Sequence, residues 1–138
     1  MSDSLTLIKK LNPSQFEHLV AAYYRTKGFK VQVLGGAYDG GVDLIARLGS
    51  EIGMEHFIVQ CKHYPDGQVG PAFVRELIGT WQINREATRA ILVTSGKFSE
   101  EAISLAKKNR IDLIDGIYLA GLLAKSAMNI NEAVRQIP

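Results

Sequence analysis

The sequence predicts an α/β fold, in which helices cover both faces of a mixed sheet. Three observations lead to this prediction. Segments with helical spacing of apolar residues alternate with strand-like segments, three strand-like segments follow one another with short connections, and one later segment is a continuous apolar run. Such a run is typical of a central strand covered on both faces. The expected order of elements is α-β-β-β-α-β-α-β-α.

The first predicted helix begins after Asn12 and ends before Gly28. Asn12 can cap this helix with Pro13 at the first helical position, or Ser14 and Glu17 can form a capping box instead. Apolar side chains then recur at helical spacing, at Phe16, Leu19, Val20 and Tyr23. Gly28 is suited to end the helix in a left-handed conformation.

The next segments predict an antiparallel meander. Residues 29–33 alternate between apolar and polar, which indicates a half-buried strand. Residues 35–41 contain four glycines and are expected to form a loop. Residues 42–47 and 55–64 are predicted as two further strands, joined by a turn that contains glycine.

The second half of the chain continues with helices and parallel strands. Pro71 opens a helix with an apolar face, and residues 90–93 form the expected central strand. Ser99 caps a helix over residues 100–109, whose first-turn acids and last-turn bases match the helix dipole. Residues 111–114 are predicted as a short last strand. The two expected helix starts that follow are Asp115, as a cap, and Asn131.

Length and composition restrict the class of protein. A chain of 138 residues is expected to form one domain over residues 1–138. Its composition, 46% hydrophobic and 22% charged, excludes wholesale disorder. Its longest uncharged apolar stretch is far shorter than the roughly 18 residues that span a bilayer. The start of the chain does not resemble a secretory signal, and its one cysteine cannot form an internal disulfide. We expect a cytoplasmic protein without a membrane partner.

Charge alone does not identify a partner. Sixteen Lys and Arg residues against fourteen Asp and Glu give a net charge of +2, and the basic residues are spread along the whole chain. This balance permits a nucleic-acid partner without arguing for one.

Polar residues in the predicted strands are the candidates for chemistry. Asp43 follows the glycine-rich loop, and Gln60 and Lys62 are two apart on one strand, so their side chains share a face. An acid, an amide oxygen and a lysine on neighbouring strands can form a site for Mg²⁺ and phosphate. Glu17 lies at the border of the apolar helix stripe and can lean toward the same sheet edge.

Judged by periodicity alone, purely structural roles for these four residues are favoured over a metal site. Asp43 can simply cap a loop, and Gln60 and Lys62 can form the solvated face of an edge strand. Glu17 can be no more than the capping-box partner of Ser14.

Several motifs nevertheless resemble the Mrr-like branch of the PD-(D/E)xK nuclease group over about residues 11–123. They are Phe16-Glu17-x-Leu19-Val20-Ala21-x-Tyr23-Tyr24, Gly28-Phe29-x-Val31, Asp39-Gly40-Gly41-Val42-Asp43-Leu44, Val59-Gln60-Cys61-Lys62, Leu92-Val93-Thr94-Ser95-Gly96-x-Phe98-Ser99-x-x-Ala102 and Leu113-Ile114-Asp115-Gly116-x-x-Leu119. The resemblance implies a restriction-endonuclease-like three-layer α/β/α sandwich around a mixed sheet, with core order αβββαβ.

The resemblance also implies a Mg²⁺-dependent endodeoxyribonuclease, with Mn²⁺ as a possible substitute. Asp43 would be the main metal ligand, Gln60 the second ligand, and the backbone carbonyl of Cys61 a further one. Lys62 would be the catalytic lysine, and Glu17 the helix-borne acid that assists the metal site. Two residues depart from the wider group: Val42 replaces the signature proline, and Gln60 replaces an acid, as is typical of the Mrr-like branch.

DNA contacts are assigned to four residues near the predicted strand ends: His63, Thr94, Ser95 and Lys97. For the Thr94-Ser95-Gly96 segment, a structural turn remains an equal alternative. Cleavage of both strands of a duplex suggests a homodimer, or a partner subunit that supplies target recognition.

The leading hypothesis for function is restriction or genome defence, of the Mrr-like type IV kind. One alternative is a structure-selective nuclease such as a Holliday-junction resolvase, which cleavage of branched against plain DNA would distinguish. The other is a catalytically idle DNA-binding module. Such a module would bind DNA in EDTA and would not cleave it, whichever divalent metal is added.

Overall fold

The computed structural model describes residues 4–35, 40–126 and 128–136. Its helices are α1 (Ser4–Lys9), α2 (Pro13–Thr26), α3 (Pro71–Ile83), α4 (Glu100–Lys108), α5 (Gly116–Lys125) and α6 (Ile130–Arg135). Its strands are β1 (Lys30–Val33), β2 (Leu44–Ser50), β3 (Gly53–Lys62), β4 (Gln68–Val69), β5 (Arg89–Thr94), β6 (Lys97–Phe98) and β7 (Asp112–Ile114). Most of the predicted glycine-rich loop, residues 36–39 including Asp39, lies outside the described residues.

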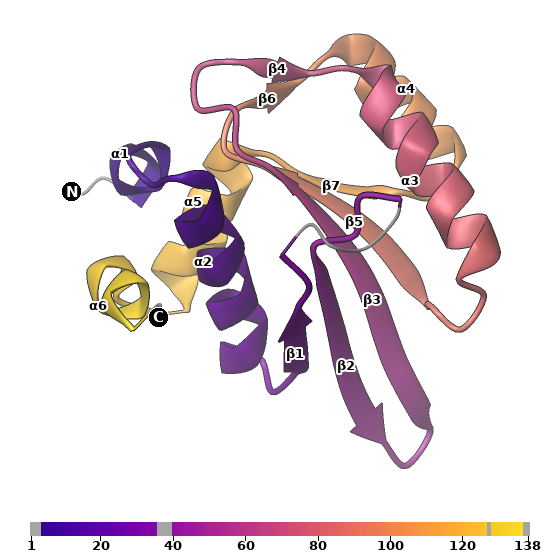
Figure 1. Ribbon diagram of the computed structural model, residues 1–138, viewed down its shortest axis with the longest axis horizontal. Helices are drawn as coiled ribbons and strands as arrows, with labels where there is room; N and C mark the ends of the chain where they lie inside the picture. The colour runs from indigo at the N-terminus through magenta and orange to yellow at the C-terminus, as the bar shows by residue number, and fades with distance from the viewer. Residues whose placement is uncertain (1–3, 36–39, 127, 137–138) are drawn as a thin grey trace.

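The central sheet has the strand order β1-β2-β3-β5-β7 and is mixed (Figure 1). Strands β1, β2 and β3 pair antiparallel, whereas β5 pairs parallel to both β3 and β7. The registers place Leu44 opposite Val59, and Lys62 opposite Thr94. The predicted meander and the predicted mixed sheet are therefore confirmed.

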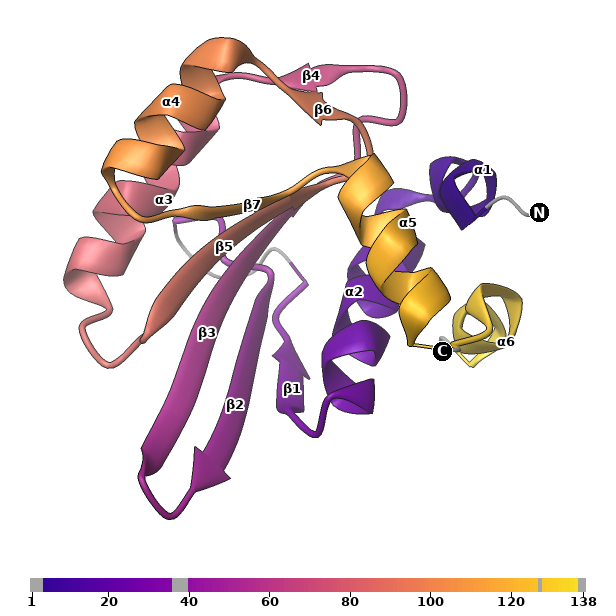
Figure 2. The same ribbon diagram turned by 180° about the vertical axis from the view of Figure 1, so that it is seen from behind.

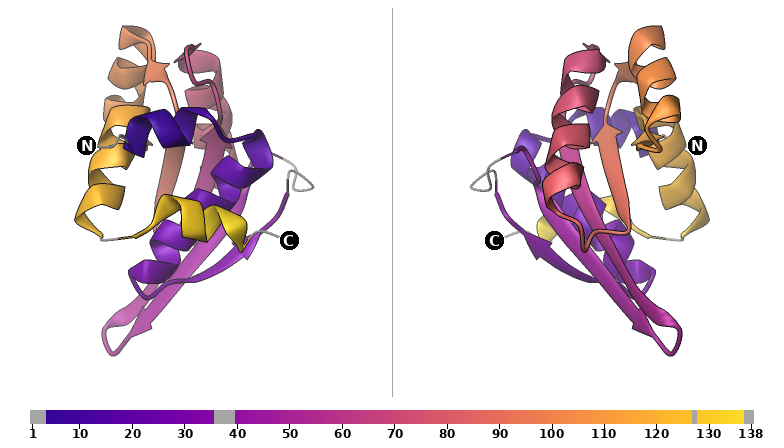
Figure 3. Two further views of the ribbon diagram at one scale, coloured as in Figure 1. Left: turned by 90° about the vertical axis from the view of Figure 1, so that its left-hand side faces the viewer. Right: turned by 90° about the vertical axis from the view of Figure 1, so that its right-hand side faces the viewer.

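Helices cover both faces of this sheet, as expected (Figure 2). One buried cluster joins α2 and α5 to the face of β3 that carries Val59 and Cys61. A second cluster joins α3 and α4 to the opposite face, which carries Ile58 on β3 and Leu92 on β5. The β2–β3 hairpin extends beyond the helical layers, so its tip lies away from the core (Figure 3).

Capping residues explain where the helices begin. The Asn12 side chain accepts a hydrogen bond of 2.8 Å from the backbone N–H of Gln15, whose own side chain bonds back to Asn12, which completes a capping box. Of the two predicted caps for α2, the structure therefore uses Asn12 rather than Ser14 with Glu17. Ser99 and Asp115 cap α4 and α5 as predicted.

Some short elements were not predicted. Helix α1 and the small parallel sheet of β4 and β6 are absent from the expected order, since two-residue strands are too short to show a period. The expected start of the last helix at Asn131 was wrong. Asn129 is the cap, because its side chain accepts from the backbone N–H of Glu132, and Asn131 lies inside α6.

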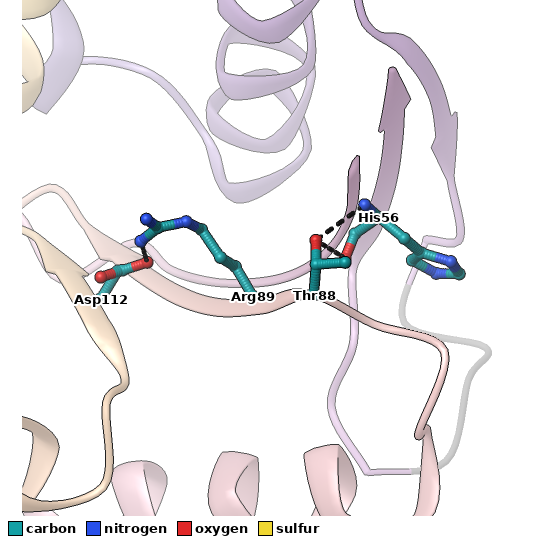
Figure 4. A network of polar contacts seen from close by, with 4 residues as sticks. All are labelled: His56, Thr88, Arg89 and Asp112. Atoms are coloured by element: carbon teal, nitrogen blue, oxygen red, sulfur yellow. Dashed lines mark hydrogen bonds and ion pairs between the residues drawn. The ribbon is translucent and has the colours of Figure 1, made fainter. Parts of the chain in front are cut away.

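Polar contacts join neighbouring strands at the end of the sheet far from the candidate site (Figure 4). The Thr88 hydroxyl accepts from the backbone N–H of His56 and donates to the backbone carbonyl of the same residue, which ties the start of β5 to β3. Next to it, Arg89 on β5 forms a 2.8 Å ion pair with Asp112 on β7. In the described part of the chain, no helix is long and apolar enough to cross a membrane.

Candidate active site

Asp43 lies directly before β2 and is held against β3. Its backbone N–H donates to the Val59 carbonyl, and its Oδ2 accepts a 2.7 Å hydrogen bond from the backbone N–H of Cys61. The carboxylate thus takes the place of a main-chain acceptor and is fixed in one orientation. Asp43 is buried, with 8% of its surface exposed.

The side chains of Val59 and Cys61 lie on one face of β3, and Gln60 projects from the other face, as its spacing predicts. Its side chain is completely buried, and its Nε2 donates a 2.8 Å hydrogen bond to Oε1 of Glu76 on α3. The other end of the amide, Oε1, is buried and has no hydrogen-bond partner among the residues that the structure describes. A buried polar atom without a partner is costly and uncommon, so this oxygen is a candidate ligand atom.

Lys62, the last residue of β3, points toward α3 on the same face as Gln60. Its Nζ lies 4.3 Å from the centroid of the Phe73 ring, a cation–π contact at the start of α3. The aromatic ring therefore restricts the position of the ammonium group without neutralising it, which leaves its charge available to a phosphate.

Glu17 lies on α2 and is half-buried at the border of the apolar stripe. Burial and, secondarily, the Asp43 carboxylate raise the pKa of Glu17, whereas His18 opposes this rise. The Asp43 pKa is also raised, mainly by burial and further by Glu76, against the Cys61 hydrogen bond and Lys62, which lower it. Asp43 is thus close enough to Glu17 of α2 to raise the pKa of that carboxyl, and Glu76 of α3 and Lys62 of β3 are close enough to act on the pKa of Asp43.

The residues present fit a hard divalent cation through oxygen donors. In the described ranges, no three His, Cys, Asp or Glu side chains are grouped so that they could hold a metal ion. A cation here would depend on neutral oxygens as well as on the Asp43 carboxylate. The unpaired, buried Oε1 of Gln60 is such a donor, and amide oxygens suit Mg²⁺. The Cys61 side chain packs in the core cluster on the other face of β3 from Gln60, so Cys61 would contribute only its backbone carbonyl.

Of the four predicted DNA-contact residues, only Lys97 is exposed. It lines a surface pocket of about 400 Å³ together with Lys9 and Asp66. Thr94 and Ser95 are buried, with 0% and 1% of their surfaces exposed.

His63 is half-buried, and both of its ring nitrogens make contacts within the protein. Nδ1 is 2.8 Å from the Ser95 hydroxyl, Nε2 bonds the backbone carbonyl of Leu11, and the ring stacks on Phe16 at 4.9 Å. His63 therefore joins the end of β3 to the α1–α2 connection.

Three residues of α3 that complete the site were missed from the sequence: Phe73, Glu76 and Thr80. Helical spacing placed the apolar residues of α3 in the core and gave the polar ones no role. One signal was available, because Glu76 is the only acid in Pro71–Ile83. Thr80, one turn later, donates a 3.0 Å hydrogen bond to the carbonyl of Gly40.

Comparisons with known proteins agree with this architecture. The chain matches the family model Mrr_cat, described as restriction endonuclease, over residues 8–123. An uncharacterized mitochondrial protein of Schizosaccharomyces pombe, C824.03c, is 33% identical over 110 residues, which are 77% of this chain and 44% of the relative. The chain spans less than half the length of the curated relatives that it matches.

Two solved structures share the fold. The DNA modification-dependent restriction endonuclease AspBHI superposes with a TM-score of 0.70 at 22% identity, over 96% of this chain and 37% of that chain. The MspJI restriction endonuclease, in complex with a 27-mer oligonucleotide, gives a TM-score of 0.60 at 21% identity, over 88% of this chain and 30% of that chain.

The family match and the shared fold together identify a nuclease domain of the restriction-endonuclease class. Because the family match covers most of the chain, the protein belongs to the Mrr_cat restriction endonuclease family.

Proposed function

We propose that this domain hydrolyses DNA phosphodiester bonds with Mg²⁺, for which Mn²⁺ can substitute. Asp43, Gln60 and the Cys61 carbonyl would hold the cation, with Glu17 assisting from α2. The observation that carries this proposal is the buried, unpaired Oε1 of Gln60, on the same face of β3 as Lys62. When bound, the cation supplies Lewis-acid polarisation of the phosphate.

The protein's own residues have separate parts in the reaction. Asp43 is held rigidly by Cys61 and so keeps its carboxylate in place without reorganisation. Lys62 stabilises the charge that develops on the attacked phosphate, or holds the attacking water and helps to deprotonate it. The water oxygen forms a bond to phosphorus while one bridging P–O bond breaks, which leaves a phosphate monoester and an alcohol.

We propose restriction or genome defence as the biological role. AspBHI, which shares the fold, is a modification-dependent restriction endonuclease, which favours modified DNA as the first substrate to test. Cutting both strands of a duplex with one active site per chain suggests a second such site, which a homodimer or a partner subunit would provide.

The experiment compares nicking of supercoiled plasmid by the wild type, Lys62→Ala and Lys125→Ala with Mg²⁺, Mn²⁺ or EDTA. Lys125 is an exposed lysine at the end of α5 and serves as the matched control. Nicking that needs a divalent metal, is lost in Lys62→Ala and persists in Lys125→Ala supports the proposal. Equal nicking by Lys62→Ala contradicts the assigned role of the lysine.

The substrate is tested in the same assay with unmodified plasmid, methylated plasmid and a four-way junction. Preference for methylated plasmid supports the defence role, whereas preference for the junction supports the resolvase alternative. DNA binding in EDTA without cleavage in any metal, on all three substrates, overturns the nuclease proposal in favour of a DNA-binding module.

A further inference from the structure

The Gln60–Glu76 hydrogen bond determines which end of the Gln60 amide faces the site. A carboxylate only accepts hydrogen bonds, whereas an amide has a donating nitrogen and an accepting oxygen. With Glu76 Oε1 at 2.8 Å from the amide, the nitrogen must face α3. The oxygen is therefore directed away from Glu76, where the structure leaves it buried and unpaired.

The Gly40–Gly41 segment lies against this pair and against Thr80 of α3. Gly41 has a φ of +80°, and a Cβ at this position would overlap the Gln60 amide nitrogen and the Glu76 carboxylate. The backbone carbonyl of Gly40, the residue before it, accepts a hydrogen bond from the Thr80 hydroxyl of α3. Helix α3 and the glycine segment thus hold the amide from two sides, which restricts its rotation.

We infer that Glu76 is a positioning residue for the metal site, acting through Gln60 by orienting its amide oxygen toward the cation. This inference rests on the proposed function. Without a carboxylate at position 76, the amide loses the partner that distinguishes its nitrogen from its oxygen. A glutamine at position 76 has the same size but can either donate or accept, so it no longer selects one orientation.

The test is a double-mutant cycle on metal affinity, with Mn²⁺ alone as the probe. The dissociation constant of Mn²⁺ is measured by electron paramagnetic resonance, without DNA, for the wild type, Glu76→Gln, Gln60→Leu and the double variant. Glu51→Gln is the matched control, because it removes an exposed carboxylate from the β2–β3 turn, outside the site. Thermal unfolding checks that each variant folds, and Gln60→Met replaces Gln60→Leu if leucine is not tolerated.

The inference predicts a strongly non-additive cycle. Glu76→Gln raises the dissociation constant about 10-fold or more, as expected when the partner that orients a ligand is removed. In the Gln60→Leu background the same change has less than a twofold effect, because the amide through which Glu76 acts is gone. Glu51→Gln leaves the dissociation constant unchanged.

Two results overturn the inference. One is an unchanged Mn²⁺ affinity in Glu76→Gln, and the other is an equal loss in both backgrounds, which would make Glu76 an independent electrostatic contributor. Plasmid nicking by the same variants separates the two proposals. If the Mn²⁺ affinities show the expected cycle but the wild type cleaves no DNA, the positioning role is supported and the nuclease function is contradicted. If the wild type binds no Mn²⁺, both proposals are overturned.

Discussion

Asp43, directly before β2, and Cys61 of β3 are joined by a 2.7 Å hydrogen bond, from the backbone N–H of Cys61 to Oδ2 of Asp43. The bond gives Asp43 two separable roles. Its oxygen satisfies a buried main-chain donor, and its charge is available for a cation. Substitutions that keep one role and remove the other can tell them apart.

We expect Asp43→Asn to fold at least as stably as the wild type at pH 7 and to lose cleavage by about 100-fold or more. The asparagine oxygen can still accept from Cys61, and burial, which raises the Asp43 pKa, no longer penalises a charge. Asp43→Ala should instead lose about 1–3 kcal/mol of stability, because the Cys61 N–H loses its partner. Urea denaturation and plasmid nicking measure the two effects. Full cleavage by Asp43→Asn would contradict the ligand assignment.

Phe73→Leu is expected to lower the cleavage rate without abolishing it. Leucine keeps apolar volume but removes the ring under the Lys62 ammonium, a contact worth about 0.5–1 kcal/mol at an accessible site. The corresponding loss is about two- to fivefold, measured as the initial nicking rate at saturating metal. A loss as large as that of Lys62→Ala would show that Phe73 does more than position the lysine.

Gly41→Ala should be more damaging than Gly35→Ala. Both glycines have a positive φ, so alanine at either position costs about 1–2 kcal/mol of backbone strain. Only at position 41 does the new methyl group also overlap the Gln60 amide and Glu76; at position 35 nothing lies within 4 Å. Denaturation midpoints compare the stabilities, and Mn²⁺ affinity should fall only in Gly41→Ala. Equal behaviour of the two variants would contradict the packing described for Gly41.

His63→Ala should lower stability by about 1–3 kcal/mol, because two internal hydrogen bonds and a ring stack are removed. His18→Ala is the comparison and should change stability by about 0.5 kcal/mol or less, since the His18 hydrogen bond found in the described part of the chain goes to the carbonyl of Ser14 on its own helix. Denaturation in urea measures both. Unchanged stability with weakened DNA binding would instead favour the DNA contact predicted for His63.

His56 should make the free energy of unfolding depend on pH. Burial and, secondarily, Arg47 lower its pKa, against Glu86, which raises it. The unfolded chain therefore takes up a proton near the ordinary pKa of about 6.5, before the folded protein does, so the His56 contribution to stability falls as the pH decreases from 7 to 5.

The raised pKa values of Glu17 and Asp43 act in the opposite direction, because their folded forms take up protons first. The measurement is therefore the difference between the wild type and His56→Gln across this pH range, which isolates the histidine. An identical pH dependence of the two proteins would contradict the prediction.

Much of the fold could be predicted from local patterns. The alternation of residues 30–33 matches the half-buried β1, the continuous apolar run matches the central β5, and the caps of α4 and α5 lie at the predicted residues. Asn129, α1 and the β4–β6 pair were missed, because a short element carries too few residues to show a period.

The site was predicted only in part. The two-residue spacing of Gln60 and Lys62 correctly placed both side chains on one face, since this follows from strand geometry. The metal-ligand roles assigned through the family resemblance stay predictions. Glu76 was missed because its partner lies 16 residues away on another element, and nothing local marks a surface acid of a helix as a partner for a buried amide.

The sequence by itself determined the longer helices, the strands of the central sheet and the family, because these depend on periodicity, capping and motifs that each lie within a short segment. Only the tertiary structure decided how the Gln60 amide is oriented, why Gly41 has no room for a side chain, and that His63 reaches Leu11, 52 residues away. Each of these contacts joins separate elements, so it exists only after the helical layers have packed on the sheet.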